Sequence, residues 1–325
     1  MFERFNKRAL LLIGAAGFIS LLSGCRCWYH GATLSEAWDQ DWATDPDAFS
    51  IVSPNDLTRD PNAPTGAVAN KNWVVEVSVV PADDAGDSLR SMRGYSVANK
   101  RYFVELGSKL ANSFGRLRNF RIIGSQAADV SGVTAVQSNA ANRLTYNITQ
   151  LSVQHVPRQY VNPVYSNGRL IRSGYWIPSK EIATVAIRVA LLAADGTQRF
   201  SLEGTGNVES ATAQEACHAA LDAAVKQVMF QYAMKFAPPS YVTMLRGNGL
   251  FAKIEIGTES GLMNGMNVNF VQLVNLGSVG GQNNVQENVI AAGQIVKVGN
   301  GFAWCKVSCH HYRVVKLGTL VKLRQ

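Results

Sequence analysis

The chain has 325 residues, 47% of them hydrophobic and 17% charged, which is enough for two globular domains with cores of their own. This composition excludes a chain dominated by low-complexity sequence. The formal net charge of +8 predicts a largely solvated basic surface, which can also meet anionic lipid head groups, an acidic polymer or nucleic acid.

Residues 1–24 have the pattern of a secretory signal peptide. Arg4, Lys7 and Arg8 precede an apolar stretch, Ala9–Leu22, which is shorter than the roughly 20 residues that a transmembrane helix needs. We therefore expect the rest of the chain to lie outside the cytoplasm, where no nucleic acid partner is expected for the basic surface.

The signal segment ends in Leu22-Ser23-Gly24-Cys25, which resembles the lipobox of bacterial lipoproteins. Small residues suit the extended backbone at a peptidase cleavage site, and the cysteine thiol is the nucleophile that accepts the lipid. The resemblance implies cleavage before Cys25 and a lipid anchor in the membrane through Cys25; the alternative is a secreted protein with a chance cysteine. Arg26 follows, rather than the aspartate that retains proteobacterial lipoproteins in the inner membrane. The resemblance therefore implies the periplasmic face of the cell outer membrane.

Residues 25–71 are predicted to form a flexible tether, with one short helical turn at Leu34–Trp38. This stretch is rich in proline and small polar residues, and pairs such as Asp45-Pro46 and Asp60-Pro61 favour turns over regular structure. A tether of this kind would hold a folded domain away from a membrane.

Residues 72–238 predict an α/β domain, a small mixed sheet with two long helices on one face. Alternating apolar positions predict strands at residues 73–80, 121–124, 144–153 and 185–191, and on either side of an Asp195-Gly196 hairpin turn. The pattern in the third of these restarts after Ile148, as in a bulged strand. Gly204-Thr205-Gly206 is interpreted as a turn at a strand end.

Apolar residues three and four apart predict helices at Ser96–Leu117 and Thr212–Phe236. Thr212 and Glu215 form a capping-box pattern at the start of the second helix, and Pro238-Pro239 ends it.

The pattern of apolar residues changes at residues 240–325. This region has short apolar strand patterns between turn signals at Gly280-Gly281 and Gly299-Asn300-Gly301, and it shows no long helical period. We expect a small all-β barrel or sandwich as a second domain.

The cysteines after Cys25 are Cys27, Cys217, Cys305 and Cys309. Cys305 and Cys309 lie on one predicted strand, where same-face residues four apart are about 13 Å from each other, too far for a disulfide. Together with His310-His311 they invite a metal interpretation, but the strand spreads the ligands, and we expect no metal and no cofactor.

No catalytic constellation is evident in the sequence. It contains no Gly-x-Ser-x-Gly, no phosphate-binding loop and no His-Glu-x-x-His, and its histidines are scattered. We therefore expect a protein that is not an enzyme, with an envelope enzyme as an alternative.

An insertion at residues 156–181 interrupts the sheet and has its own hairpin signal, Asn167-Gly168. Its aromatic side chains are Tyr160, Tyr165, Tyr175 and Trp176. Such a hairpin is either a partner-binding element or a cover for the domain's own core.

The α/β pattern resembles the CsgG, LpoB and TolB-N-terminal group of envelope proteins. The resemblance rests on the strand Asn72–Val80, the helix ending at Leu117, the strand Phe120–Ile123, and the strands at 143–149 and 185–192. Residues 252–268 are similar to the C-terminal barrel of the flagellar protein FlgT. These relatives imply non-catalytic roles as scaffold rings, a synthase activator or a secretion pore, with envelope or secretion-machinery proteins or further copies of the chain as partners.

A CsgG-like oligomeric secretion channel would need spanning strands of about 9 to 11 residues with a clean lipid-facing row. Pro157, Pro163 and Pro178 interrupt the insertion, three arginines lie within it, and residues 202–212 leave little room for a second hairpin. The sequence therefore favours a scaffold or assembly lipoprotein over a channel.

Overall fold

A computed structural model describes the chain in two compact units. The described residues are 45–48, 74–83, 97–125, 142–279, 282–308 and 314–324. One unit comprises residues 69–237 with 258–262, and the other comprises 1–68, 238–257 and 263–325.

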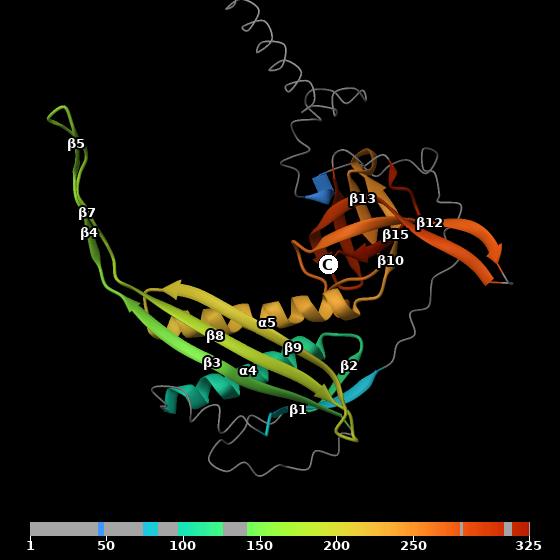
Figure 1. Cartoon of the computed structure of the whole chain (residues 1–325), viewed down its shortest axis with the longest axis horizontal. Helices are drawn as coiled ribbons and strands as arrows, with labels where there is room; N and C mark the ends of the chain where they lie inside the picture. The colour runs from blue at the N-terminus through green and yellow to red at the C-terminus, as the bar shows by residue number, and fades with distance from the viewer. Residues whose placement is uncertain are drawn as a thin grey trace, which may run out of the picture. The chain divides into compact units, whose positions relative to one another are not determined.

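The first unit contains a five-stranded mixed sheet in the order β2-β1-β3-β8-β9 (Figure 1). Its strands are β1 (Val75–Pro81), β2 (Phe120–Ser125), β3 (Asn142–Val156), β8 (Lys180–Leu192) and β9 (Gln198–Ser210). Strand β1 runs parallel to both β2 and β3, whereas β3, β8 and β9 are antiparallel to their neighbours. The predicted bulge in β3 is confirmed between Ile148 and Gln150.

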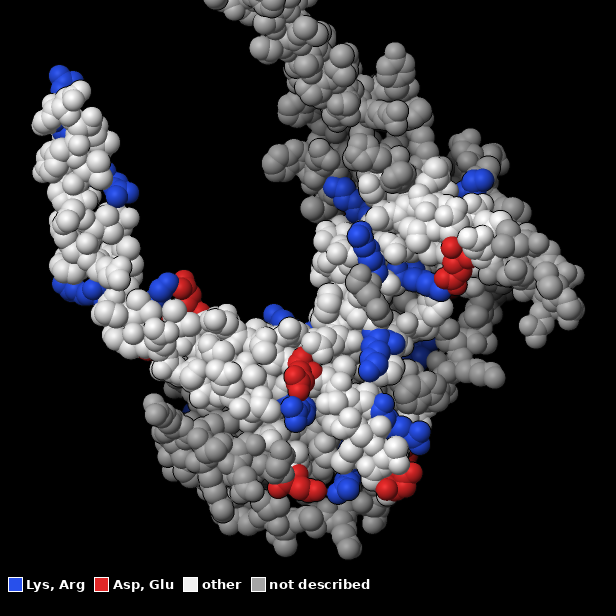
Figure 2. Space-filling view, in the orientation of Figure 1, with Lys and Arg blue, Asp and Glu red and all other residues white. Residues whose placement is uncertain are grey.

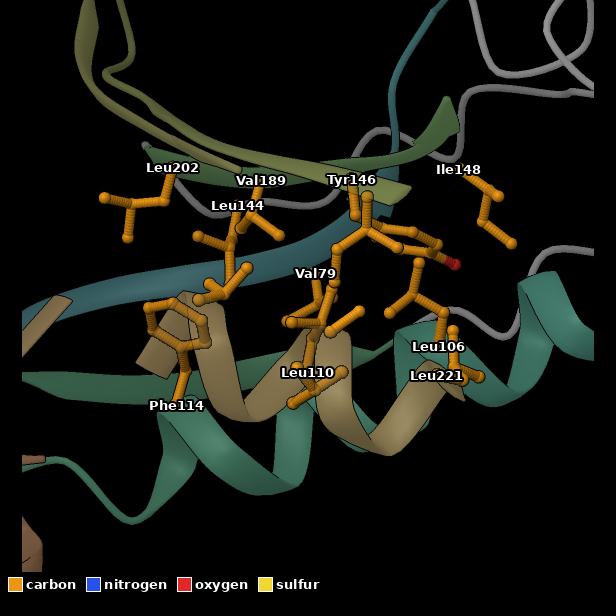
Figure 3. Packing of buried hydrophobic residues seen from close by; sticks show 14 of the residues in the cluster. Val79, Leu106, Leu110, Phe114, Leu144, Tyr146, Ile148, Val189, Leu202 and Leu221 are labelled. Atoms are coloured by element: carbon orange, nitrogen blue, oxygen red, sulfur yellow. The ribbon is translucent and has the colours of Figure 1, made fainter. Parts of the chain in front are cut away.

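Two helices, α4 (Val97–Gly115) and α5 (Ala213–Phe236), cover one face of this sheet and enclose a single core with it (Figure 3). Leu144, Tyr146 and Ile148 alternate along β3 and are fully buried. The matching side chains of α4 are Phe103, Leu106, Leu110 and Phe114. Their spacing of three and four residues places them on one helix face, so both predicted periodicities are confirmed.

Helix α5 begins and ends at the predicted signals. The Thr212 hydroxyl accepts a hydrogen bond from the Glu215 N–H at 3.3 Å, which satisfies one of the donors left free in the first turn. The last helical residue is Phe236, and Pro238 follows the Ala237 cap. Proline has no N–H and cannot continue the helix.

The interpretation of Gly204-Thr205-Gly206 as a turn was wrong, because all three residues lie within β9. The glycines instead let α5 pack directly on the strand. A Cβ atom on Gly204 would lie 2.2 Å from the Ala224 carbonyl oxygen, and one on Gly206 would lie 1.9 Å from that of Ala220. Close backbone approach is a use of glycine that sequence spacing alone does not distinguish from a turn.

The second unit is a closed six-stranded barrel, which decides between the predicted barrel and sandwich. Its order is β10 (Ser240–Arg246), β11 (Phe251–Ile254), β14 (Phe302–Val307), β13 (Gln282–Gly299), β12 (Asn267–Val279) and β15 (Leu320–Leu323). All neighbouring strands are antiparallel. The predicted turn before β14 is confirmed, with Gly301 at a φ of +76°, whereas Gly280-Gly281 lies outside the described residues.

Candidate interaction site: a projecting two-stranded arm

The lipobox residues Leu22, Ser23, Gly24 and Cys25 lie outside the described residues, as do Cys27 and Cys309. In the part of the chain that the structure describes, no helix is long and apolar enough to cross a membrane. The predicted site residues that lie within the described part of the chain are those of the insertion.

The insertion forms a two-stranded arm that continues β3 and β8 beyond the sheet (Figure 1). We define the arm as residues 157–179. Pairing between β3 and β8 runs as far as Val156 opposite Lys180, and the ladder then stops near Pro157 and Pro178, which lie at the two ends of the arm. Further out, β4 (Gln159–Val161) pairs with β7 (Tyr175–Ile177), and β5 (Val164–Ser166) pairs with β6 (Arg169–Arg172).

The tip of the arm is the predicted tight turn. Asn167 and Gly168 both have positive φ angles, 49° and 71°. Positive φ at both central residues defines a type I′ turn, whose twist matches that of an antiparallel ribbon. Asparagine and glycine tolerate this conformation, so the hairpin signal is confirmed.

One face of the arm carries a row of contacts between a cation and two rings, which are tilted at 53° to each other. The Arg158 guanidinium carbon lies 4.0 Å from the centroid of the Trp176 ring, and the Trp176 and Tyr160 ring centroids are 4.9 Å apart. Tyr160 and Trp176 are direct partners across the ribbon, which places them on the same face. Gly174 leaves room for these contacts, since a Cβ atom there would lie 2.1 Å from the Tyr160 hydroxyl oxygen.

The structure therefore brings together only two of the four predicted binding aromatics. Tyr175 neighbours Trp176 in β7 and points to the opposite face, where the Arg172 guanidinium carbon lies 5.3 Å from its ring centroid. Tyr165 lies opposite Leu170 near the tip. The pairing of Trp176 with Arg158 and of Tyr175 with Arg172 was missed, because the sequence does not reveal the register and twist of the arm.

The arm's large side chains are exposed to solvent. Trp176 is 54% exposed, Tyr165 63% and Ile171 66%, and no arm residue belongs to the core cluster of the α/β unit. The alternative interpretation, that the insertion covers the domain's own core, was therefore wrong. Because the described arm strands pair only with each other, their outer edges have unpaired backbone groups. Such a ribbon is marginally stable without a further contact.

Charge on the arm has one sign. Residues 157–180 include three arginines and one lysine and no acidic residue. Figure 2 shows basic side chains along the arm and acidic ones only at its base. At this base the His155 Nδ1 atom lies 2.6 Å from a Glu181 carboxylate oxygen. The arm thus combines aromatic rings, aliphatic side chains and guanidinium groups, the residue types enriched in protein–protein interfaces.

Cys217, Cys305 and His218 lie in surroundings that favour a structural role. Burial raises the pKa of the Cys305 thiol to about 12 and also raises that of Cys217, so both thiols stay protonated. His218 lies 2.7 Å from a Glu105 carboxylate oxygen across the two helices. Among the described residues, no group of three or more His, Cys, Asp or Glu side chains could hold a metal ion.

Comparison with protein-family models gave no match for this chain, and neither did comparison with curated protein sequences.

Proposed function

We propose that the chain is a lipid-anchored scaffold or assembly lipoprotein of the bacterial outer membrane, and that it binds another envelope protein through its arm. The observation that carries the proposal is the arm itself. It projects from a complete α/β core, exposes paired aromatic and aliphatic side chains on both faces, and contributes nothing to that core. The resemblance of the α/β unit to the CsgG, LpoB and TolB-N-terminal group supports the same class of role.

The lipobox supports the anchor and the envelope location. Replacing Cys25 by serine removes the thiol that would accept the lipid. We expect incorporation of labelled palmitate into the wild-type chain and its loss in Cys25→Ser, with the variant released into the soluble envelope fraction. Label on both chains, or on neither, would contradict an anchor at Cys25.

Binding through the arm is tested by photo-crosslinking in cells. A benzophenone side chain at Tyr165 places the reactive group on a residue that is 63% exposed, and the same group at Phe230 of α5, which is 40% exposed, is the matched control. We expect one defined adduct with a second envelope protein from position 165, abolished by Arg158→Ala with Trp176→Ala. Equal adducts from both positions, or none from position 165, would contradict the proposal.

A secretion channel is the second candidate, and the unpaired edges of the arm are the observation that favours it. Arms of neighbouring copies could pair edge to edge and close into a ring. The interrupting prolines and the uniform positive charge oppose this arrangement, since identical basic ribbons side by side repel one another. In the crosslinking experiment, a channel predicts adducts between copies of this chain.

A further inference from the structure

A short segment of the N-terminal region lies against the outside of the barrel. Pro46–Ala48 forms one turn of 3-10 helix, and the Asp47 N–H donates to the Asp45 carboxylate at 3.1 Å. This bond gives the segment a turn of its own. Pro46 is buried, whereas both aspartates are exposed.

Arg246, which contacts this segment, also contacts Trp304 of the barrel. Alternation along β14 places Ala303 and Cys305 in the barrel interior, so Trp304 points outward. Trp304 is nevertheless only 4% exposed, because it forms a buried cluster with Leu250 and Phe251. The guanidinium carbon of Arg246 lies 4.9 Å from the centroid of its ring, a cation–π geometry.

Two cations of the barrel hold the segment. Arg246 Nη1 donates to the Pro46 carbonyl oxygen at 3.0 Å and to an Asp47 carboxylate oxygen at 2.6 Å. The Lys297 Nζ atom donates to the other Asp47 carboxylate oxygen, and it lies 3.7 Å from the Asp45 Oδ1 atom. The partners are 200 residues apart for Arg246 and Pro46 and 250 residues apart for Lys297 and Asp47, and they come from three separate segments.

We propose that Arg246, Lys297 and Trp304 form a binding site for an Asp-Pro-Asp segment, and that Asp45–Ala48 of the same chain occupies it as a releasable strap. The site matches the ligand point by point. The Trp304 ring supports the Arg246 guanidinium from below, and Arg246 and Lys297 bind the Pro46 carbonyl and the flanking carboxylates. The contacts are few and largely at the surface, so the strap can open while the barrel stays folded.

The strap lies within the predicted tether, residues 25–71, and attaches it to the barrel at Asp45–Ala48. If Cys25 carries the anchor, an inference that rests on the proposed function, only residues 26–44 separate the lipid from the barrel contact. At about 3.5 Å per residue they reach at most roughly 70 Å from the membrane. Release of the strap removes that limit, so occupancy of the site would set how far the barrel stands from the anchor.

The first test measures strap opening with a protease that cuts before aspartate, applied to the chain from residue 25 onward with Cys25→Ser. Lys297→Glu removes a cation of the site, and Lys322→Glu is its control. Both lysines are exposed to a similar degree, 43% and 39%, and each pairs with an acidic residue, but Lys322 pairs with Glu287 away from the strap.

Loss of the Lys297 contacts predicts cleavage before Asp45 up to about tenfold faster in Lys297→Glu than in the wild type or in Lys322→Glu. The variant Lys297→Arg keeps a cation beside Asp47 and should leave cleavage before Asp45 near the wild-type rate. Equal rates in wild type, Lys297→Glu and the control would overturn the strap.

The second test asks whether the site recognises the segment in trans. A fluorescent peptide with the sequence of residues 41–52 is titrated into the variant Asp45→Asn with Asp47→Asn, whose own strap is weakened. We expect binding to this variant, at least several-fold weaker binding to the wild-type chain, and none after the further change Lys297→Glu. A peptide with asparagine at both aspartate positions should not bind. Failure of the peptide to bind the weakened variant at millimolar concentration would overturn the site.

Both assays use a chain without lipid, so their outcome is independent of whether Cys25 is lipidated. A negative result in the strap assays would not argue against the lipid anchor or against binding by the arm. Negative results in the Cys25 and arm experiments would likewise not argue against the strap.

Discussion

At the scale of single residues, glycine has three different uses in this chain. Gly168 supplies a positive φ in a tight turn, Gly174 leaves room for the Tyr160 ring, and Gly206 lets a helix touch a strand. Only the first use has a sequence signature, because Asn-Gly between two strand patterns predicts a turn. The other two depend on what lies opposite, which the local sequence does not reveal.

Substitution of Gly206 by alanine tests the close packing of α5 on β9. The added Cβ would lie 1.9 Å from a backbone carbonyl oxygen of α5, and backbone cannot move aside as a flexible side chain can. We expect the α/β unit to lose about 2–3 kcal/mol of unfolding free energy, measured by urea denaturation.

The control is Gly115→Ala, where the nearest atom to the new Cβ would be 3.4 Å away, an ordinary contact. This change should be neutral or slightly stabilising, because alanine favours helix by up to about 1 kcal/mol over glycine. A Gly206→Ala variant as stable as Gly115→Ala would show that the helix does not rest on the strand backbone.

The strap should respond to pH in a defined window. Its titratable and charged groups are Asp45, Asp47, Arg246 and Lys297. The hydrogen bond from Lys297, with help from Arg246, lowers the pKa of Asp47 below its ordinary value of 3.8. Because its pKa is lower in the closed strap, ionised Asp47 stabilises the closed state at any pH above its ordinary pKa. This stabilising free energy is lost as the pH falls through the lowered pKa.

We therefore expect the strap to stay closed from about pH 5 to pH 8 and to open only below about pH 4. The carboxyl carbon shift of Asp47, followed by NMR, should titrate below 3.8 in the wild type and move up in Lys297→Glu. An unchanged midpoint in that variant would argue against the ion pair.

At the scale of elements, the two helices and most sheet strands were predictable from periodicity. The core residues recur every three or four positions in α4 and every second position in β3, which are the spacings that place them on one buried face. These spacings can be read directly from the sequence. The arm was predictable as a hairpin, but not as a projecting one, because exposed and buried aromatic strands look alike in sequence. The Asp-Pro-Asp segment was interpreted as tether, since its partners are 200 and 250 residues away.

The arm is an appendage and should be removable. Replacing residues 157–179 by a two-residue Asn-Gly turn joins β3 to β8 directly, and those strands already pair up to Val156 and Lys180. Because no arm residue lies in the core, we expect the unfolding free energy of the α/β unit to change by less than about 0.5 kcal/mol. A loss of several kcal/mol on denaturation would mean that the arm supports the sheet.

At the scale of the whole molecule, each unit combines a core with one outward-facing feature that we propose as a binding site. The α/β core and the closed barrel are complete in themselves, whereas the arm and the strap site hold the chemistry that faces outward. For this reason we propose a scaffold that collects partners at a membrane rather than a channel, whose wall must come from many copies.

The number of copies in solution tests that account most directly. The chain from residue 25 onward, with Cys25→Ser, would be examined by light scattering in plain buffer and in detergent, with the arm present and with residues 157–179 replaced. The account predicts a monomer or dimer of the same mass in all four conditions. A ring-sized oligomer that needs detergent only when the arm is present would contradict it, and would make the arm the wall of a pore.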